Sequence, residues 1–398
     1  MIPIAKPYLT EEEAQAAYDT ILSGWITQGP RVQEFEERFA EYTGAKYAVA
    51  VSNCTTALHL SMIVSGIGVE DEVICPSMSY IATANAIRYV GAVPVFAEVQ
   101  GDSYNLDPID CERKITNRTK AILIVHQMGM PADINVFKSL AQKYNIKLIE
   151  DAACAAGSQY QKKKIGSSSD LVCFSFHPRK VISTGDGGMI TTTRKDYYSR
   201  LKLLRQHGMS INDRVRHESK TLIFEDHLEL GYNYRMTDIQ AAVGIKQLEK
   251  LEWIVEERRK IAMKYHNAFK HLPYLQLPFE KDGYLSNYQS YSIYLKRSSP
   301  VLRDRLMQEL LDRGIASRRG ILTVHREKAY RNSSFKVYLP VSEDLQDHSI
   351  LLPLFVPMEI EQVDYIIRNF LEILLKGSTS RVSFGKGPLD YECLSEEV

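Results

Sequence analysis

The sequence predicts an α/β protein, with a large domain built on a mostly parallel sheet and a smaller C-terminal α+β domain. Three observations lead to this prediction. Short apolar runs alternate with helical stretches in the first half, a long helical stretch begins near residue 237, and strand-like and helical segments alternate again after residue 289. Strands that are buried on both faces and separated by helices are typical of parallel sheets with right-handed crossovers.

The elements of the first half follow one another in a regular order. Helical periodicity covers residues 11–23 and 31–42. Short apolar runs bounded by turn residues then predict buried strands. These runs are Tyr47–Val51, Glu72–Cys75, Val93–Val99, Ala121–His126, Lys147–Glu150, Leu171–Phe176 and Gly188–Thr192. Helices are expected between them, near residues 56–65, 80–90, 108–114 and 135–144.

The second half predicts a linking helix and a smaller domain. Thr237 or Asp238 can cap the long helix, which continues to about His271. A strand is expected at Ser290–Leu295, and helices are expected at Val301–Arg313 and Ile360–Leu375. We therefore assign residues 1–245 to the large domain, 246–376 to the small domain with its linking helix, and 377–398 to a polar tail expected to be mobile.

The composition excludes several classes of protein. The 398 residues carry a formal net charge of zero, so no general basic field draws the chain to nucleic acid or to an anionic membrane. The sequence shows neither a signal peptide nor 18 consecutive apolar residues, so no membrane span is expected. Its six cysteines are scattered without a CxxC pair, which favours a reduced, cytoplasmic setting without a metal site.

Two polar side chains follow strand ends, where ligands bind in α/β sheets. Lys180 lies between the strand that ends at Phe176 and a Gly-rich turn, and its amine can form a Schiff base once its pKa is lowered. Asp151 either caps a helix or pairs with a protonated pyridine nitrogen, which makes that ring an electron sink. Asp151 and Lys180 are 29 residues apart, a spacing that fits one strand–helix–strand connection. Both groups can therefore lie at the same edge of the sheet.

Weaker signals accompany this pair. A helix begins at Thr55 and Thr56, and its free N–H groups, with these hydroxyls and that of Ser175, can hold a phosphate. Ser and Thr are also common at helix starts for structural reasons. Tyr80 either stacks on a flat ring or packs as a structural aromatic residue. The segment 231–244 (GYNYRMTDIQAAVG) by itself indicates a capped helix start.

Several motifs stand in register along the chain. They are ILSGWITQGPRVQEFE, DEVICPSMSYIATANAI, VHQMGMPADI, EDAACAAG, SFHPRKVISTGDGG, GYNYRMTDIQAAVG, RRGILTVHREKAYR and ILLPLF. Over roughly residues 2–372 the chain thereby resembles the DegT/DnrJ/StrS family of sugar aminotransferases. This family has the aspartate-aminotransferase-like fold (fold type I) and uses pyridoxal 5'-phosphate (PLP), which cycles with pyridoxamine phosphate.

The resemblance implies catalytic roles for two residues. Lys180 matches the lysine that forms the Schiff base with PLP and moves the proton, and Asp151 matches the partner of the pyridine nitrogen. Cys154 stands where relatives often have Gln or His, and the resemblance implies that this position lies by the cofactor ring. Asp186 stands where Glu is common.

Five further cofactor contacts are implied in the same way. Thr55, Thr56 and Ser175 match the phosphate cradle, and Tyr80 matches the aromatic residue that stacks on the ring. Asn233 matches an asparagine that reaches the cofactor phosphate of the neighbouring subunit. The resemblance therefore implies a homodimer with shared active sites.

The implied reaction moves an amino group from L-glutamate to a nucleotide-linked keto-sugar in amino-sugar and surface-polysaccharide biosynthesis. The resemblance implies a 4-keto-6-deoxyhexose as the acceptor or, less often, a 3-keto sugar. HQMGMPAD and RRGILTVHREKAYR are most similar to the perosamine-synthase-like branch, which points to a GDP- or UDP-linked 4-keto sugar. Cyclitol acceptors stay open. Candidates for contacts with the diphosphate or sugar are Arg235, Arg318, Arg319, His325 and Arg326. Each of these can equally be a surface or structural charge.

Particular residues argue against three alternative functions. A PLP-dependent sugar dehydratase of the same fold carries His in place of the Schiff-base lysine, and Lys180 argues against it. A non-catalytic regulatory relative would have a degraded site, whereas Lys180, Asp151, Ser175 and Asn233 are all present. A nicotinamide-binding oxidoreductase needs GxGxxG after the first strand, where this chain has SNCTTA.

Overall fold

The computed structural model of the protein describes residues 1–211, 220–331 and 337–380, with side chains up to residue 376. Its last helix, α13 (Ile360–Ser380), continues through residues 377–380, which the sequence assigned to a polar tail. The remainder of that predicted tail, residues 381–398, lies outside the described residues.

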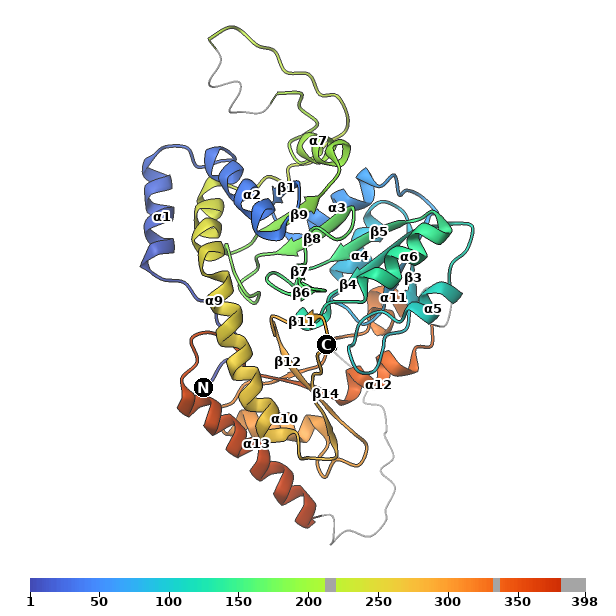
Figure 1. Cartoon of the computed structure of the whole chain (residues 1–398), viewed down its shortest axis with the longest axis vertical. Helices are drawn as coiled ribbons and strands as arrows, with labels where there is room; N and C mark the ends of the chain where they lie inside the picture. Colours follow the sequence, from blue (N-terminus) through green and yellow to red (C-terminus); the bar gives the residue numbers. More distant parts are fainter. Residues whose placement is uncertain (212–219, 332–336, 381–398) are drawn as a thin grey trace, which may run out of the picture.

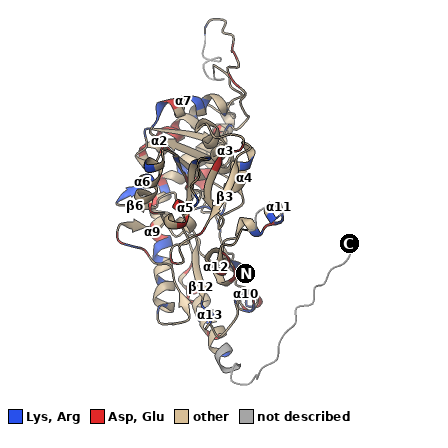
Figure 2. Ribbon diagram, turned by 90° about the vertical axis from the view of Figure 1, so that its right-hand side faces the viewer, with Lys and Arg blue, Asp and Glu red and all other residues tan. Residues whose placement is uncertain are grey.

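Charged residues of both signs are spread along the described chain (Figure 2). Lys and Arg are interspersed with Asp and Glu over both ends of the molecule (Figure 2). Among the helices of the described ranges, none is long and apolar enough to cross a membrane.

A seven-stranded sheet forms the core of the upper part of the molecule in Figure 1, in the order β1-β9-β8-β5-β4-β2-β3. The strands are β1 (Tyr47–Val51), β2 (Glu72–Pro76), β3 (Val93–Ala97), β4 (Thr119–Val125), β5 (Lys147–Asp151), β8 (Leu171–Ser175) and β9 (Gly188–Thr192). Only β9 is antiparallel to its two neighbours, β1 and β8. The prediction of a mostly parallel sheet is therefore confirmed.

Helices cover both faces of this sheet. Alternate residues of each strand face opposite sides, so Cys173 contributes to one hydrophobic cluster and Phe174 to the other. The cluster with Cys173 includes residues of α3 (Cys54–Val64), α4 (Ala82–Tyr89) and α7 (Lys195–Leu204). The cluster with Phe174 includes residues of α2 (Pro30–Thr43), α5 (Pro108–Arg113), α6 (Ile134–Tyr144) and α9 (Asp238–Phe269). Both faces are buried, which explains the continuous apolar runs.

A second sheet, antiparallel throughout, forms the lower part of the molecule in Figure 1. Its order is β10 (Leu275–Gln276), β12 (Tyr291–Leu295), β14 (Ser349–Leu352) and β13 (Arg318–Arg319). The accompanying helices are α10 (Arg303–Asp312), α11 (Lys328–Arg331), α12 (Pro340–His348) and α13. The N-terminal residues also lie here, because Ile2 N–H donates to Gly314 O at 2.7 Å.

A small third sheet connects the two parts. Strand β11 (Tyr284–Leu285) pairs with β6 (Gln159–Tyr160), which pairs in turn with β7 (Lys163–Lys164). Through β11, the segment that leads into the second sheet runs beside the loops that follow β5 of the large sheet. This contact positions part of the candidate site.

The start of the long helix α9 stabilises two helices at once. Thr237 is its N-cap and forms a capping box with Gln240. Asp238, the other capping candidate, is buried and serves a different helix. Its carboxylate accepts from the N–H groups of Gly29 (2.7 Å) and Val32 (3.0 Å), at the N-terminus of α2. The N-terminus of α2 has no side-chain cap of its own. Asp238, which lies 206 residues from Val32 along the chain, supplies one.

Buried Glu13 joins the N-terminal helix α1 (Glu11–Leu22) to α9. Its carboxylate accepts from Lys250 (2.7 Å) and Gln247 (2.9 Å) of α9 and from Thr10 (2.7 Å). Burial raises the pKa of Glu13, but these hydrogen bonds outweigh burial and lower the pKa from 4.5 to about 2. The cluster therefore stabilises the fold above pH 4.5, and this contribution is lost as the pH falls towards 2.

Candidate active site

The loops after β5 and β8 meet at the carboxyl edge of the large sheet and bring the two predicted catalytic residues into one cluster. Lys180 Nζ donates to Cys154 Sγ at 3.2 Å. Asp151, at the end of β5, and Cys54, at the start of α3, are close enough for their charges to act on the lysine. The geometry thus assembles an amine, a carboxylate and two thiols from three separate segments.

The protonation of Lys180 differs from the expectation. The sequence interpretation required a lowered pKa for an amine at this position. Burial does lower the pKa of Lys180, but Cys154, Cys54 and Asp151 together raise it above its ordinary value of 10.5.

Asp151 is buried, with 5% of its surface exposed, and its carboxylate accepts two hydrogen bonds. Thr83 Oγ1 donates to Oδ2 at 2.8 Å, and Ala153 N–H donates to Oδ1 at 3.1 Å. Burial raises the pKa of Asp151, while these two donors act in the opposite direction. The residues directly after Asp151 form turns and not a helix, so the helix-cap alternative is wrong.

The N-terminus of α3, where the sequence predicts phosphate binding, lies beside this cluster. Asn53 caps the helix and forms a capping box with Thr56, whose hydroxyl donates to Asn53 O at 2.7 Å. Gly188, paired with Ser175, faces this helix end closely: an added Cβ would lie 2.5 Å from the Asn53 carbonyl carbon. Only glycine lets the β8–β9 hairpin, which carries Ser175 opposite Gly188, approach the N-terminus of α3 this closely.

The remaining cofactor candidates differ in exposure. Tyr80 precedes α4 and is 71% exposed, so the alternative of a packed aromatic residue is wrong. The side chain of Asn233 is exposed and makes no hydrogen bond within the described ranges. Thr55 is half-buried in the first turn of α3, beside Thr56.

The substrate candidates do not form one group. His325 contacts Ser77 at 2.6 Å and Glu343 at 3.1 Å, and Arg326 pairs with Asp347 at 2.9 Å. Intramolecular partners therefore occupy these two side chains. Arg318 and Arg319 are exposed on β13, and Arg235 is half-buried. Within the described part of the chain, none of these three arginines forms an ion pair.

Sequence reasoning missed a strap, residues 286–290, that lies against the site. Asn287 Nδ2 donates to Cys154 O and Ala156 O, both at 2.8 Å, and Gln289 Nε2 donates to Arg179 O at 3.0 Å. Gly129 is also fitted to the strap, because an added Cβ would lie 1.8 Å from Asn287 Oδ1. These partners are more than 100 residues apart, so no local pattern could have indicated them.

Buried Arg258 of α9 holds this strap in place. Its guanidinium donates to Tyr288 O at 3.0 Å, Gln289 O at 2.7 Å and Leu354 O at 3.1 Å. No carboxylate in the described ranges pairs with it, so three carbonyl dipoles compensate a buried cation. Arg258 of α9 therefore fixes the backbone of the strap, while the side-chain amides of Asn287 and Gln289 reach the loops around Lys180.

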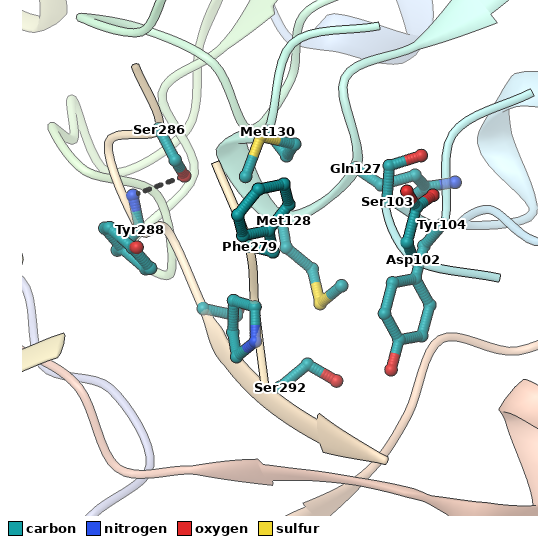
Figure 3. A pocket seen from close by; sticks show the side chains of 12 residues that line it. Asp102, Ser103, Tyr104, Gln127, Met128, Met130, Phe279, Ser286, Tyr288 and Ser292 are labelled. Carbon is teal, nitrogen blue, oxygen red and sulfur yellow. Dashed lines mark hydrogen bonds between the residues drawn. The ribbon is translucent and has the colours of Figure 1, made fainter. Parts of the chain in front are cut away.

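A separate cavity of about 340 Å³, open solvent at its mouth included, lies between the strap and the loops around residues 102–104 and 127–130 (Figure 3). Met128, Met130 and Phe279 turn their side chains into it. Neither Lys180 nor Asp151 lines it. The chemistry-bearing cluster at the strand ends, rather than this mostly apolar cavity, is therefore the candidate active site.

The model of the DegT/DnrJ/EryC1/StrS aminotransferase family matches residues 7–371. The chain belongs to this family. It is 34% identical to the spore coat polysaccharide biosynthesis protein SpsC of Bacillus subtilis, with 94% of this chain and 97% of SpsC covered. Like the members of this family, it is a PLP-dependent sugar aminotransferase with the PLP fold type I.

Solved structures of family members are closely similar. The putative sugar aminotransferase Spr1654 of Streptococcus pneumoniae, in its PMP form, superimposes with a TM-score of 0.89 at 30% identity, covering 95% of this chain and 100% of Spr1654. PseC of Helicobacter pylori, an aminotransferase involved in the biosynthesis of pseudoaminic acid, gives 0.88 at 29% identity, with coverage of 94% and 99%.

The residues of the cluster fit PLP. The close approach that Gly188 permits leaves a helix N-terminus facing the β8–β9 hairpin, which suits a phosphate group. The buried carboxylate of Asp151 suits a protonated pyridine nitrogen, and the amine of Lys180 suits an aldehyde. The exposed ring of Tyr80 is available for stacking.

Proposed function

We propose that this aminotransferase moves an amino group from L-glutamate to the ketone of a nucleotide-linked 4-keto-6-deoxyhexose, in amino-sugar and surface-polysaccharide biosynthesis. The observation that carries the proposal is the cluster of Lys180, Cys154 and Asp151 at the strand ends. The names of SpsC and PseC support a sugar product. The motifs HQMGMPAD and RRGILTVHREKAYR support a 4-keto acceptor.

Each residue of the cluster has a distinct task in this proposal. Bound PLP supplies an electron sink for the carbon that loses or gains the amino group. Lys180 Nζ holds the cofactor and then takes the proton from the donor α-carbon, acting as base and afterwards as acid. The Asp151 carboxylate keeps the proton on the pyridine nitrogen. The N-terminus of α3, with Thr55, Thr56 and Ser175, binds the phosphate.

The substrate proposal is tested by a two-step assay. The PLP-loaded protein is first incubated with L-glutamate alone, and 2-oxoglutarate is quantified against the number of sites. A panel of GDP-, UDP- and dTDP-linked 4-keto-6-deoxyhexoses is then added, and aminated sugar is detected by mass spectrometry. We expect one 2-oxoglutarate per site in the first step, because the two half-reactions are separable. No amination of any 4-keto sugar, together with amination of a 3-keto sugar or cyclitol ketone, would overturn the acceptor.

We also propose a homodimer in which Asn233 completes the phosphate site of the partner subunit. Residues 220–230 extend away from the large sheet, beyond α7 (Figure 1). They carry four exposed apolar side chains: Leu222, Phe224, Leu228 and Leu230. Apolar side chains on a projecting segment favour burial against another copy of the chain. Asn233 follows directly after this segment and is itself exposed.

Mixing two inactive variants tests the shared site. In a heterodimer of Lys180→Ala and Asn233→Ala subunits, one site carries both substitutions and the other carries neither. With random exchange, half of the dimers are mixed, so we expect about a quarter of the wild-type activity to return. Activity that stays at the mean of the two parent variants would show that Asn233 acts in its own subunit or not at all. Sedimentation of each variant provides the control for dimer formation.

A further inference from the structure

Two buried hydroxyl groups lead from the start of α4 to the carboxylate of Asp151. Ser79 Oγ lies 2.7 Å from Thr83 Oγ1, and Thr83 Oγ1 lies 2.8 Å from Asp151 Oδ2. We propose that Thr83 and Ser79 form a hydroxyl relay that keeps Asp151 ionised and correctly oriented. The relay is a positioning device, and its catalytic consequence rests on the proposed function, in which Asp151 holds a proton on the pyridine nitrogen.

The direction of this relay follows from the chemistry of its groups. An ionised carboxylate can only accept, so the single hydroxyl hydrogen of Thr83 points to Asp151. The oxygen of Thr83 is then left to accept from the hydroxyl of Ser79. Both residues are at most 2% exposed, so their hydrogen bonds lie in a region of low dielectric constant, where a donor stabilises the anion most effectively.

Local helix capping does not explain the relay. The N-cap position of α4 is Ile81, which makes no side-chain hydrogen bond. Thr83, in the first turn of the helix, directs its hydroxyl to a strand end 68 residues away along the chain. Ser79 is fixed separately, because its N–H donates to Leu322 O at 3.2 Å. The Thr83 hydroxyl is therefore directed at the carboxylate, and a tertiary backbone contact holds Ser79 where its hydroxyl meets that of Thr83.

The surroundings of Asp151 make a directed donor necessary. Burial is the largest influence and raises the pKa of Asp151. The ionisable groups that act on it come from the neighbouring segments and are Lys180, His126, Cys54 and Cys173. Apart from the lysine and the histidine, these groups add no positive charge. Two hydrogen-bond donors, Thr83 Oγ1 and Ala153 N–H, contact the carboxylate directly, and only the first can be deleted by mutation.

An infrared titration of the cofactor-free protein tests the relay directly. The carbonyl stretch of the protonated Asp151 carboxyl is assigned by its absence in Asp151→Asn and is followed against pH. We expect Thr83→Val to raise the midpoint by about one pH unit, because a hydrogen bond to a charged group contributes roughly that much. Ser79→Ala should raise the midpoint less, and Thr83→Ser, which keeps the hydroxyl, should have the wild-type midpoint.

A matched control separates the relay from the general cost of deleting a buried hydroxyl. Thr191 is fully buried, and its hydroxyl donates to Gly166 O at 2.6 Å, away from the site. Thr191→Val should leave the midpoint unchanged. A midpoint in Thr83→Val equal to that of the wild type would overturn the relay. If Thr83→Val does not fold, Ser79→Ala decides the same comparison. An unchanged midpoint in Ser79→Ala would then overturn the relay.

A second readout distinguishes failure of the relay from failure of the proposed role of Asp151. The visible absorbance of the PLP-loaded enzyme is titrated with pH in the same variants, without substrate. A shift of both the infrared and the visible midpoints supports the relay and its effect on the cofactor. An infrared shift with an unchanged visible titration supports the relay but overturns the role of Asp151 at the pyridine nitrogen.

Discussion

Replacing Lys180 by alanine should abolish amino transfer, with a loss of kcat on the order of 10⁴-fold or more. The substitution removes both the amine that holds the cofactor and the base that moves the proton, and the other ionisable neighbours, Cys154, Cys54 and Asp151, cannot supply an amine. Single-turnover formation of 2-oxoglutarate from L-glutamate measures the loss. The variant should still bind PLP through the phosphate site, but without the visible band of the lysine-attached cofactor.

Two companion variants show whether the amine itself is required. Lys180→Arg keeps the positive charge but cannot attach the cofactor, so it should be as inactive as the alanine variant. Lys120→Ala removes an exposed lysine of β4 and should retain wild-type activity. If Lys180→Ala kept more than a hundredth of the wild-type rate, the assignment of Lys180 would be wrong.

Replacing Asp151 by asparagine should lower kcat by about 10³-fold while leaving PLP bound. The neutral amide keeps the shape of the side chain but no longer balances the charge of a protonated pyridine nitrogen. The KM for L-glutamate should change little, because the donor does not contact this residue in the proposed mechanism. A loss confined to KM, with kcat intact, would argue against the assigned role.

The same substitution should stabilise the cofactor-free protein at neutral pH. Burial raises the pKa of Asp151, so the native state binds its proton more tightly than the unfolded state does. The wild-type free energy of unfolding therefore falls as the pH rises through the range above 3.8, the ordinary value for aspartate. Asp151→Asn removes this loss, and we expect a higher free energy of unfolding than that of the wild type at pH 7.5. Urea unfolding at pH 7.5 and below pH 3.8 should show the gain only at the higher pH.

Local patterns were sufficient to predict most of the fold. Strands β1 and β9 begin and end where the apolar runs do, and the long helix begins at its capping box, because burial and capping are encoded within a few residues. The antiparallel direction of β9 could not be read in this way, since an apolar run does not reveal which way a strand points. The two-residue strands of the third sheet carry no pattern at all.

The candidate site was predicted where a residue's type reveals its chemistry. Asp151 ends the buried strand β5, Lys180 lies in the loop after β8, and the structure brings them together. Thr83, Asn287 and Arg258 each act through a partner far away in the sequence, so their side chains look ordinary when read in order. The role of each site residue and the domain division at residue 245 stay predictions.

The strap described above limits how this chain can be recombined with its relatives. Asn287 and Gln289 belong by sequence to the C-terminal half, yet their amides bond to the loops that carry Cys154 and Arg179. A chimera joined at residue 245 would therefore combine one parent's strap with the other parent's active-site loops. Exchange of acceptor specificity between family members should succeed more often when the block transferred with the C-terminal half also includes residues 127–130 and 151–160.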